Sequence, residues 1–350
     1  MQIKEHVSLK KLNTFGIDVT SRYFAEIRTA HDLQNLFSQD IILDYPPLIL
    51  GGGSNILFAG DYSGIVIHIA TRGVEMIDPE SGNALSEGDS SDTGEVFVRV
   101  QAGEPWDDFV AHCVNKGWGG LENLSLIPGQ VGSSPIQNIG AYGVEMKDCF
   151  HSLVAMEKKT GKLVTFNKEA CQFGYRDSFF KQQGRDLYVI LHVTFRLTTR
   201  NHQLHTSYGS LIPELKAMGI NTPGIADIRK AVIAIRNSKL PDPEIIGNAG
   251  SFFKNPTISI ETFERLRKNW PDMPGFPVPG GIKLAAGWLI EKAGWKAYRE
   301  HHVGVHQHQA LVLVNHGTAT GQDILRLAEK ISNSINQQFD INLETEVNII

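Results

Sequence analysis

The feature that most constrains this chain is an uncharged run at 126–143, LIPGQVGSSPIQNIGAYG, rich in glycine, serine, asparagine and glutamine. Glycine lets the backbone turn freely and lets a ligand approach the amides closely. Successive exposed amides can bind an anion such as a pyrophosphate without any lysine or arginine. An ordinary glycine-rich loop is the common alternative, but such a loop would not need the isoleucines, prolines and tyrosine found here. The run therefore predicts a wall around a large nucleotide cofactor.

A second glycine-rich turn, Gly51-Gly-Gly-Ser-Asn55, follows a short β-like run. Neither turn spells Gly-x-Gly-x-x-Gly between a strand and a helix, so the dinucleotide fingerprint of the Rossmann fold is absent. Strand-like and helix-like segments also mix without a regular βαβ rhythm. The sequence thus predicts a different flavin or nucleotide fold.

Hydrophobic patterns place the main elements. They predict strands at 48–50, 65–69, 97–100, 163–166, 187–197 and 310–314, and helices at 106–114 and 228–236. A last helix carries an apolar stripe from Ile324 to Ile335 and follows Thr320-Gly-Gln-Asp323, which resembles a capping box. The acidic segment 78–95 is poor in apolar residues and is expected to be an exposed hairpin tip or a loose loop.

Composition narrows the class of protein. The chain has 350 residues, 20% of them charged, and a net charge of -5, so no global field favours nucleic acid or an anionic membrane. It has no basic-then-apolar signal pattern and no apolar run near the ~20 residues that cross a bilayer. Cys113, Cys149 and Cys171 are odd in number and fit reduced thiols better than disulfides. We expect a cytoplasmic protein without membrane insertion or a nucleic-acid partner.

The histidines at 301, 302, 306 and 308 could suggest a metal site. They lie around the strand-like Val303-Gly-Val305, and no cysteine or cluster of carboxylates near them completes a ligand set. We therefore expect no metal.

A set of motifs, spread in order over nearly the whole chain, resembles the UDP-N-acetylenolpyruvoylglucosamine reductase family. The motifs are Asn13-Thr-Phe-Gly-Ile17, Leu50-Gly-Gly-Gly-Ser-Asn55, Gly120-Leu-Glu-Asn through to Glu145, Phe173-Gly-Tyr-Arg-Asp-Ser178, Lys239-Leu-Pro-Asp-Pro243, Gly247-Asn-Ala-Gly-Ser-Phe-Phe-Lys-Asn-Pro256 and Leu343-Glu-Thr-Glu-Val347. Each motif alone is weak, but the ordered set is specific. A tyrosine at 208 is similar to the substrate-loop tyrosine of the family's type I branch.

The resemblance implies an α+β fold: an FAD-binding fold of the vanillyl-alcohol-oxidase type in two subdomains, plus a smaller α/β substrate-binding domain. We expect the subdomains at 1–72 and 73–238 and the substrate domain at 239–345. Whether 346–350 return to the first subdomain is left open. The chain is expected to be a monomer.

The resemblance also implies the activity. Family members bind FAD noncovalently and use NADPH to reduce an enolpyruvyl ether, which gives UDP-N-acetylmuramate for the peptidoglycan of a bacterial cell wall. Two alternatives are a flavin oxidase of the same fold, which would use oxygen, and a nucleotide-sugar-binding module without catalysis.

The family's catalytic positions fall on Arg176, Ser251 and Glu346. The resemblance implies that Arg176 stabilises charge on the substrate carboxylate, which suits its planar and permanently charged fork, and that Ser251 donates the proton. Glu346 would act beside Arg176. The structural alternatives are an ion pair of Arg176 with Asp177 or Asp148, a helix-capping or turn serine, and an exposed glutamate near the terminus.

The resemblance implies that further residues bind the substrate and the cofactor. The substrate positions are Tyr175, Tyr208, Lys239, Asn255, Lys283 and Gln309, with Tyr208 and Lys239 closing over the diphosphate. The FAD positions are Gly51, Gly52, Gly53, Ser54, Asn55, Pro128, Gly129, Gly132, Ser133, Ser134, Asn138, Gly140, Gly143 and Arg236, where Arg236 would add a cation near the pyrophosphate or simply end a helix. Two positions depart from some relatives: Phe276 replaces a tyrosine and Asn348 replaces an arginine.

Overall fold

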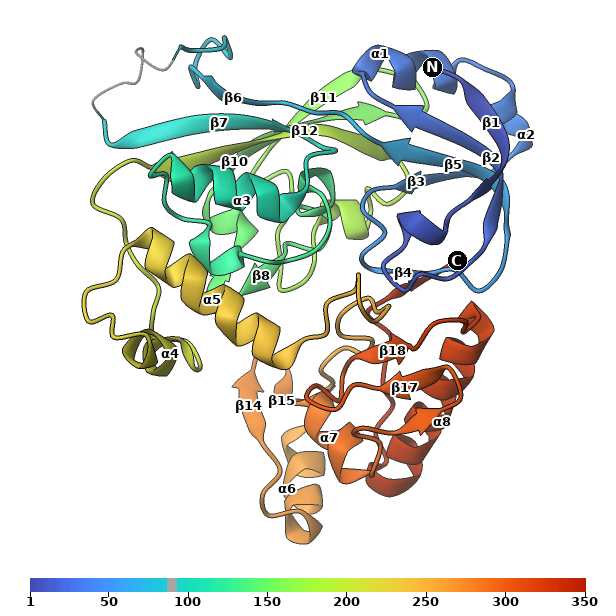
Figure 1. Cartoon of the computed structure of the whole chain (residues 1–350), viewed down its shortest axis with the longest axis vertical. Coiled ribbons are helices and arrows are strands. Elements are labelled where there is room, and N and C mark those ends of the chain that lie inside the picture. The colour runs from blue at the N-terminus through green and yellow to red at the C-terminus, as the bar shows by residue number, and fades with distance from the viewer. Residues whose placement is uncertain (87–92) are drawn as a thin grey trace. The chain divides into compact units, whose positions relative to one another are not determined.

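The computed structural model describes residues 1–86 and 93–350, and the chain, drawn in Figure 1, divides into two compact units. The first unit contains Met1–Glu5, Tyr23–Gly52 and Ser63–Ser238. The second contains His6–Arg22, Gly53–Tyr62 and Lys239–Ile350.

The first unit has a four-stranded sheet in the order β1-β2-β5-β3. Its strands are β1 (Ile3–Ser8), β2 (Thr20–Ile27), β5 (Tyr62–Ile69) and β3 (Pro47–Leu50), with β3 parallel to β5. Two helices, α1 (Ala30–Phe37) and α2 (Ile41–Asp44), connect β2 to β3. Thr29 and Asp32 form a capping box at the start of α1. Buried Leu33 and Leu36 of α1 then pack with Ile65 and Ile67 of β5 in one core.

A second, antiparallel sheet of the first unit has the order β11-β10-β12-β7-β6. Its strands are β6 (Val74–Ile77), β7 (Glu95–Gln101), β10 (Phe150–Glu157), β11 (Leu163–Asn167) and β12 (Tyr188–Thr198). In β7 the valines alternate with half-buried polar or aromatic residues, so one face of the sheet is apolar. Helix α3 (Trp106–Asn115) covers that face, and Trp106 and Phe109 both contact Phe195 there (Figure 1).

This unit also contains the α-helices α4 (Leu211–Ala217) and α5 (Ile225–Lys239) and the short pair β8 (Gly140–Ala141) and β9 (Val144–Glu145). The apolar stripe of α5, formed by Ile228, Val232 and Ile235, is buried against α4. The acidic segment 78–95 joins β6 to β7. In its described part the Asp78 carboxylate accepts hydrogen bonds from Ser81, which closes a turn, whereas 87–92 lie outside the described residues.

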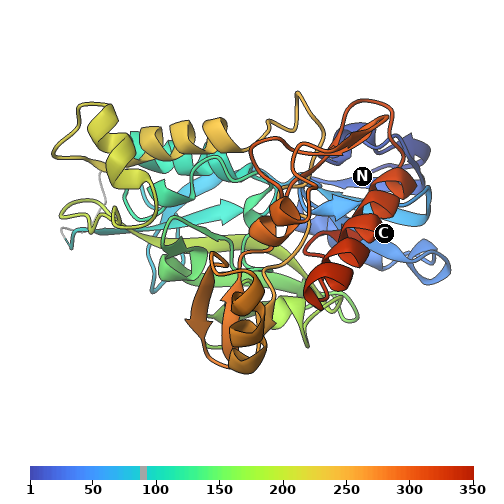
Figure 2. The same cartoon turned by 90° about the horizontal axis from the view of Figure 1, so that it is seen from below.

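The second unit combines three small sheets with three α-helices. The sheets are β13-β15-β14 (Thr257–Ile258, Gly281–Leu284 and Gly275–Val278), β16-β17-β18 (Arg299–Glu300, Val303–Val305 and Leu313–Asn315) and β19-β4 (Asn348–Ile349 and Ile56–Leu57). The helices are α6 (Ile260–Asn269), α7 (Ala286–Lys292) and α8 (Gly321–Phe339), of which Figure 2 shows α8 along its length. The capping box of Thr320 and Asp323 and the buried stripe from Ile324 to Ile335 are both present in α8, as the sequence predicts.

The predicted helices are confirmed, with α5 longer at both ends than expected. The strand predicted at 310–314 is wrong in its first half, because β18 begins at Leu313. The two preceding residues pair elsewhere: the Leu311 carbonyl accepts a hydrogen bond from the Phe252 amide, and Val312 bridges Ser251. Leu311 and Val312 therefore lie beside Ser251, one of the predicted catalytic positions.

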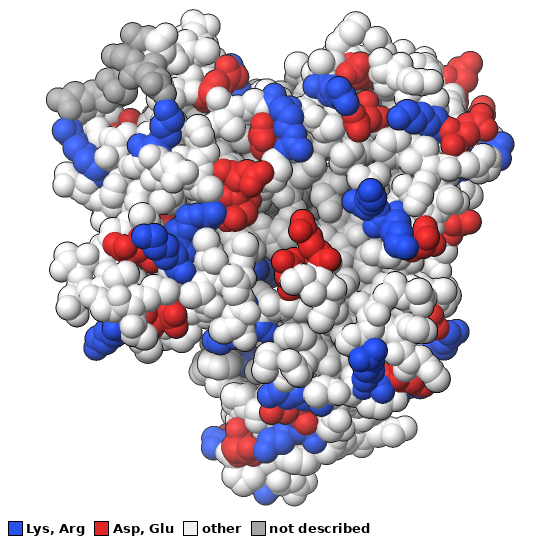
Figure 3. All heavy atoms as spheres, viewed as in Figure 1, with Lys and Arg blue, Asp and Glu red and all other residues white. Residues whose placement is uncertain are grey.

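Three observations bear on the class of protein. Within 1–86 and 93–350, no helix is long and apolar enough to cross a membrane. All three cysteines are free, and burial raises the pKa of Cys149 and Cys171 to about 12. On the face drawn in Figure 3, acidic and basic side chains are interspersed, and neither kind gathers in a patch of its own.

Candidate active site

The two glycine-rich turns predicted from the sequence meet in the first unit. A Cβ placed on Gly52 would lie 3.1 Å from the Cα of Gly129, and one on Gly51 would lie 3.0 Å from the Oε1 of Gln130. The contact at Gly52 is with backbone and is tighter than ordinary van der Waals contact, so glycine there favours the close approach of the two backbones, whereas the atom nearest Gly51 is the end of a flexible side chain. The sequence separates these turns by more than seventy positions, and the fold joins them into one wall.

The run at 126–143 is fixed to its unit by the backbone. The amides of Val131 and Gly132 donate to the carbonyls of Glu104 and Ala102 at 2.9 and 2.8 Å. A Cβ on Gly132 would lie 2.5 Å from the Cβ of Ala102, so this glycine is also needed for close approach. These contacts fix the backbone of Val131 and Gly132 to the segment 102–104 of the first unit.

The polar side chains of the run are largely used inside the fold. Ser133 and Ser134 donate their hydroxyl hydrogens to the carbonyls of Gln130 and Val131. Asn138 is fully buried, donates to the Gly174 carbonyl at 2.9 Å and accepts from the Lys147 amide at 3.1 Å. These side-chain hydrogen bonds hold the run in shape, and the amides of Ser133 and Ser134 are likewise bonded within it, to the carbonyls of Gln130 and Val131.

The rest of the Gly51–Asn55 turn belongs to the second unit. Gly53 has φ +61°, and a Cβ there would lie 2.0 Å from the Leu12 carbonyl oxygen. Asn55 donates from Nδ2 to the Glu346 carbonyl at 3.3 Å and accepts at its own carbonyl from the Asn348 amide and side chain. Asn348, which replaces an arginine of some relatives, thus holds the turn through neutral hydrogen bonds.

Arg176 lies in the first unit beside the run. Its φ is +54°, its Nη2 donates to the Gly140 carbonyl, and its guanidinium lies 5.7 Å from the ring centre of Tyr175. The alternative of an ion pair is wrong within the described residues. Asp177 accepts from Gln182 and Ser178, and Asp148 accepts from the Glu145 amide. The charge of Arg176 therefore remains available to an anionic ligand.

Ser251 and Glu346 come together in the second unit. Ser251 bridges Val312 on one side, and the next residue, Phe252, accepts a 2.8 Å hydrogen bond from the Glu346 amide on the other. Ser251 thus lies in an extended segment between two others, so the alternative of a helix-capping serine is wrong. Glu346 is half-buried, whereas Glu344 is exposed and pairs with Lys254 at 2.9 Å. The two glutamates of the motif therefore lie in different surroundings.

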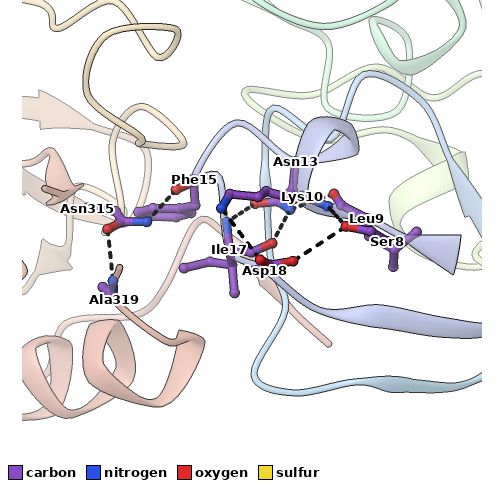
Figure 4. A network of polar contacts seen from close by, with 9 residues as sticks. All are labelled: Ser8, Leu9, Lys10, Asn13, Phe15, Ile17, Asp18, Asn315 and Ala319. Atoms are coloured by element: carbon purple, nitrogen blue, oxygen red, sulfur yellow. Dashed lines mark hydrogen bonds and ion pairs between the residues drawn. The ribbon is translucent and has the colours of Figure 1, made fainter. Parts of the chain in front are cut away.

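A buried asparagine that the sequence analysis missed secures this region (Figure 4). Asn315 donates from Nδ2 to the Phe15 carbonyl at 2.8 Å and accepts at Oδ1 from the amides of Gly317 and Ala319. Its own amide donates to the Gly247 carbonyl, four residues before Ser251. A polar residue that ends an otherwise apolar strand was the signal in the sequence.

The N-terminal motif forms the other side of the same network. Asn13 is buried, donates to the Leu9 and Ile17 carbonyls and accepts from the Ile17 amide, which closes a tight loop (Figure 4). A Cβ on Gly247 would lie 2.2 Å from the Phe15 carbonyl oxygen, so this loop packs directly on the segment that leads to Ser251.

The substrate positions fall into both units. In the first, Tyr175 and Tyr208 are 62% and 60% exposed, and the Cβ of Tyr208 would lie 3.3 Å from a Cβ on Gly143. In the second, Asn255 accepts from the Ala286 amide at the start of α7, and Gln309 lies 3.4 Å from a Cβ on Gly287. The start of α7 thus brings Asn255 and Gln309 together.

Two further substrate positions in the second unit have different surroundings. Lys283 on β15 lies between Thr257 and Phe276 on its two neighbouring strands. Phe276 is 56% exposed and occupies the position where some relatives have tyrosine. Lys239 is the exposed last residue of α5.

Arg236 gives the clearest sign of an anion. Its Nε is buried and has no hydrogen-bond partner in the described part of the chain. Burial lowers the pKa of its guanidinium, while nearby Tyr142 and Asp107 act in the opposite direction. A buried donor without an acceptor is costly, and a pyrophosphate would supply one. The glycine cradle and Arg236 together fit FAD.

Comparisons with known proteins agree with this geometry. A family model for the C-terminal domain of UDP-N-acetylenolpyruvoylglucosamine reductase matches residues 242–350, and one for an FAD binding domain matches residues 22–167. The chain is 47% identical to a UDP-N-acetylenolpyruvoylglucosamine reductase of Pseudomonas aeruginosa, covering 100% of this chain and 99% of that one. It is 44% identical to one of Flavobacterium johnsoniae, covering 100% of both.

A solved structure shares the fold. The crystal structure of UDP-N-acetylenolpyruvylglucosamine reductase from Thermus caldophilus matches with a TM-score of 0.66 at 22% identity, covering 100% of this chain and 99% of that one. With the match to an FAD binding domain, this confirms the expected fold of mixed helices and strands around an FAD site.

Proposed function

Because the chain belongs to the UDP-N-acetylenolpyruvoylglucosamine reductase family, we propose that Arg176, Ser251 and Glu346 carry out its chemistry. The activity is the NADPH-dependent reduction of the enolpyruvyl ether of UDP-N-acetyl-3-O-(1-carboxyvinyl)glucosamine to UDP-N-acetylmuramate, a step of peptidoglycan synthesis. FAD, when bound, would supply the redox chemistry that passes a hydride from NADPH to the methylene carbon of the enolpyruvyl group.

The protein must deal with the charge that this addition creates. A hydride on the methylene carbon leaves an electron pair on the neighbouring carbon, delocalised into its carboxylate. A fixed cation stabilises such charge more in a site shielded from water than in solution. Arg176 suits this role because no acidic side chain in the described residues neutralises it. Tyr175, whose ring lies beside the guanidinium, would position it.

Ser251 would complete the reaction. Its Oγ–H donates a proton to the carbon that carries the electron pair, which forms a C–H bond and leaves an alkoxide on Oγ. A hydroxyl is a weak acid, but a carbanion of this kind is a strong base, so transfer is feasible with good geometry. The observation that carries the proposal is the pairing of the Ser251 segment with that of half-buried Glu346. We propose that Glu346 orients the groups around Ser251.

The remaining residues would bind the ligands. The amides around Gly51–Asn55 and Pro128–Gly143, with Arg236, hold FAD. Tyr208 and Lys239 close over the diphosphate of the sugar nucleotide, and Asn255, Lys283 and Gln309 contact the substrate. We further propose that residues 1–72 and 73–238 form two FAD-binding subdomains and that residues 239–345 form a substrate-binding domain. We also propose that the enzyme is monomeric and cytoplasmic and has no nucleic-acid partner.

The test is the oxidation of NADPH by purified protein under anaerobic conditions, with and without the enolpyruvyl UDP-sugar. We expect oxidation only when the sugar is present, with one NADPH consumed per UDP-N-acetylmuramate formed. Oxidation that requires oxygen instead would indicate the flavin oxidase. A colourless protein that binds the UDP-sugar without a flavin spectrum would indicate a binding module, and either result would contradict the proposal.

A further inference from the structure

A pair of charged residues joins two helices of the first unit beside the glycine-rich run. Arg229 on α5 donates from Nη1 to the Asp107 Oδ1 at 2.6 Å and from Nη2 to Oδ2 at 2.9 Å. The side chains are 15% and 28% exposed. A two-bond fork of this kind fixes orientation as well as distance. The resemblance to a known family assigned no role to either residue.

Asp107 also contacts the run itself. Its Oδ1 accepts a 2.5 Å hydrogen bond from the amide of Leu126, the first residue of the run. Leu126 has φ +58°, a left-handed conformation that is unfavourable for a non-glycine residue. The Asp107 carboxylate therefore stabilises a backbone conformation that leucine does not favour by itself.

The start of α3 holds the run at neighbouring points. The Trp106 indole donates to the Leu124 carbonyl at 2.9 Å, and the Trp106 amide donates to the Gly129 carbonyl at 3.0 Å. Gly129 is the residue that packs against Gly52 in the cradle. Asp107 thus contacts the first residue of the run, Leu126. Three residues further on, Gly129 packs against Gly52 of the second glycine-rich turn.

The charge of Asp107 is maintained despite its surroundings. Burial raises the pKa of its carboxyl, but hydrogen bonds from Arg229 and Leu126 and the charges of Arg229 and Arg236 outweigh burial, so the pKa is lowered overall. The carboxylate in turn favours the charged form of Arg236, whose buried Nε has no hydrogen-bond partner within 1–86 and 93–350. The Asp107 carboxylate therefore affects two parts of the proposed cofactor cradle: it accepts a hydrogen bond from the glycine-rich run and it favours the charge of Arg236.

We propose that Asp107 is a positioning residue for FAD. Its carboxylate, held in place by Arg229, fixes the backbone of Leu126 at one end of the cradle by accepting the hydrogen bond of the Leu126 amide. The inference rests on the proposed function, in which the run binds FAD. It differs from a purely structural role of the ion pair, in which only the stability of the unit would depend on Asp107 and Arg229.

Three variants separate these roles. Asp107→Leu removes the acceptor of the Leu126 amide and leaves Arg229 unpaired. Asp107→Asn keeps an oxygen for that amide. The double variant Asp107→Leu/Arg229→Met removes the unpaired charge, which should restore stability, but it still offers Leu126 no acceptor. Glu75→Gln is the matched control, because Glu75 forms a half-buried 2.8 Å ion pair with Arg99 on β6 and β7.

The readouts are the Kd of FAD for the apoprotein, from the quenching of flavin fluorescence, and the thermal midpoint of the same apoprotein. We expect Asp107→Leu to raise the Kd by about tenfold or more, since a hydrogen bond to a charged group contributes ~1.5–3 kcal/mol. Asp107→Asn should stay within about threefold of the unchanged protein. The double variant should regain the thermal midpoint yet keep the raised Kd, and Glu75→Gln should leave the Kd unchanged.

Several results would overturn the inference. One is a double variant that binds FAD as tightly as the unchanged protein. Others are an equal loss for Asp107→Asn and Asp107→Leu, losses of affinity that follow the thermal midpoints throughout, or no change in any Kd. If the unchanged protein itself fails to bind FAD, the proposed function fails and the inference with it, so the two failures are distinguishable.

Discussion

The backbone amide of Glu346 donates a 2.8 Å hydrogen bond to the carbonyl of Phe252, the residue that follows Ser251. Nearly a hundred positions separate the two in the chain, yet this bond places the second glutamate of the C-terminal motif beside the segment of the proposed proton donor. The first glutamate of the motif, Glu344, instead pairs with Lys254 at the surface.

The two glutamates give a matched pair of variants. We expect Glu346→Gln to lower kcat by about a hundredfold or more, because we propose that this half-buried carboxylate orients the groups around Ser251 in the transition state. Glu344→Gln should leave kcat unchanged and alter the free energy of unfolding by less than about 1 kcal/mol, as for exposed ion pairs generally. Steady-state kinetics and urea unfolding of both variants check this. Equal losses of kcat would contradict the distinction.

Asn315 should be a major determinant of stability in the second unit. Asn315→Leu leaves the Phe15 carbonyl and the amides of Gly317 and Ala319 without their partner. Each such buried group costs about 1–3 kcal/mol, so we expect a loss of at least about 2 kcal/mol in the free energy of unfolding, measured by urea denaturation. Asn342→Leu, at an exposed position, is the control. A loss below about 0.5 kcal/mol would show that the network contributes little.

The stability of the first unit should depend on His192 in acid. Burial, aided by the charge of Arg99 and opposed by that of Glu75, lowers the pKa of His192 from 6.5 to about 4. Between these values the unfolded chain binds a proton that the folded chain does not, so stability falls as the pH falls from 6.5 towards 4. The slope from this group is at most about 1.4 kcal/mol per pH unit.

The check is the free energy of unfolding of the unchanged protein and of His192→Gln at several pH values. The variant cannot bind the proton, so its stability should fall less steeply over this window. His6→Gln, at an exposed position, should keep the full slope. Identical slopes for all three proteins would contradict a buried neutral His192.

The sequence predicted the parts of this fold that depend on local patterns. The capping box and apolar stripe of α8, the strand at 97–100 and the helix at 228–236 are all set by residues a few positions apart. The glycine-rich run was also recognisable, because glycine and small polar residues in that density are uncommon in ordinary loops.

What the sequence could not predict depends on contacts between distant segments. Leu311 and Val312 look like the start of a strand, but they pair with the Ser251 segment rather than continue β18. In the sequence, Asn315 and Asp107 are ordinary polar residues. Only the fold brings Asn315 into contact with Phe15 and Asp107 into contact with Leu126. Their importance comes from burial and from partners that no local pattern indicates.

The most direct test of the central claim is anaerobic stopped-flow measurement of the two half-reactions of Ser251→Ala, with Ser332→Ala on α8 as the control. The account expects NADPH to reduce the bound flavin in Ser251→Ala at nearly the rate of the unchanged protein. Reoxidation of the flavin by the enolpyruvyl UDP-sugar should slow by about a hundredfold or more, because the proton donor is missing. Equal slowing of both half-reactions, or reoxidation at the unchanged rate, would contradict the assignment of Ser251.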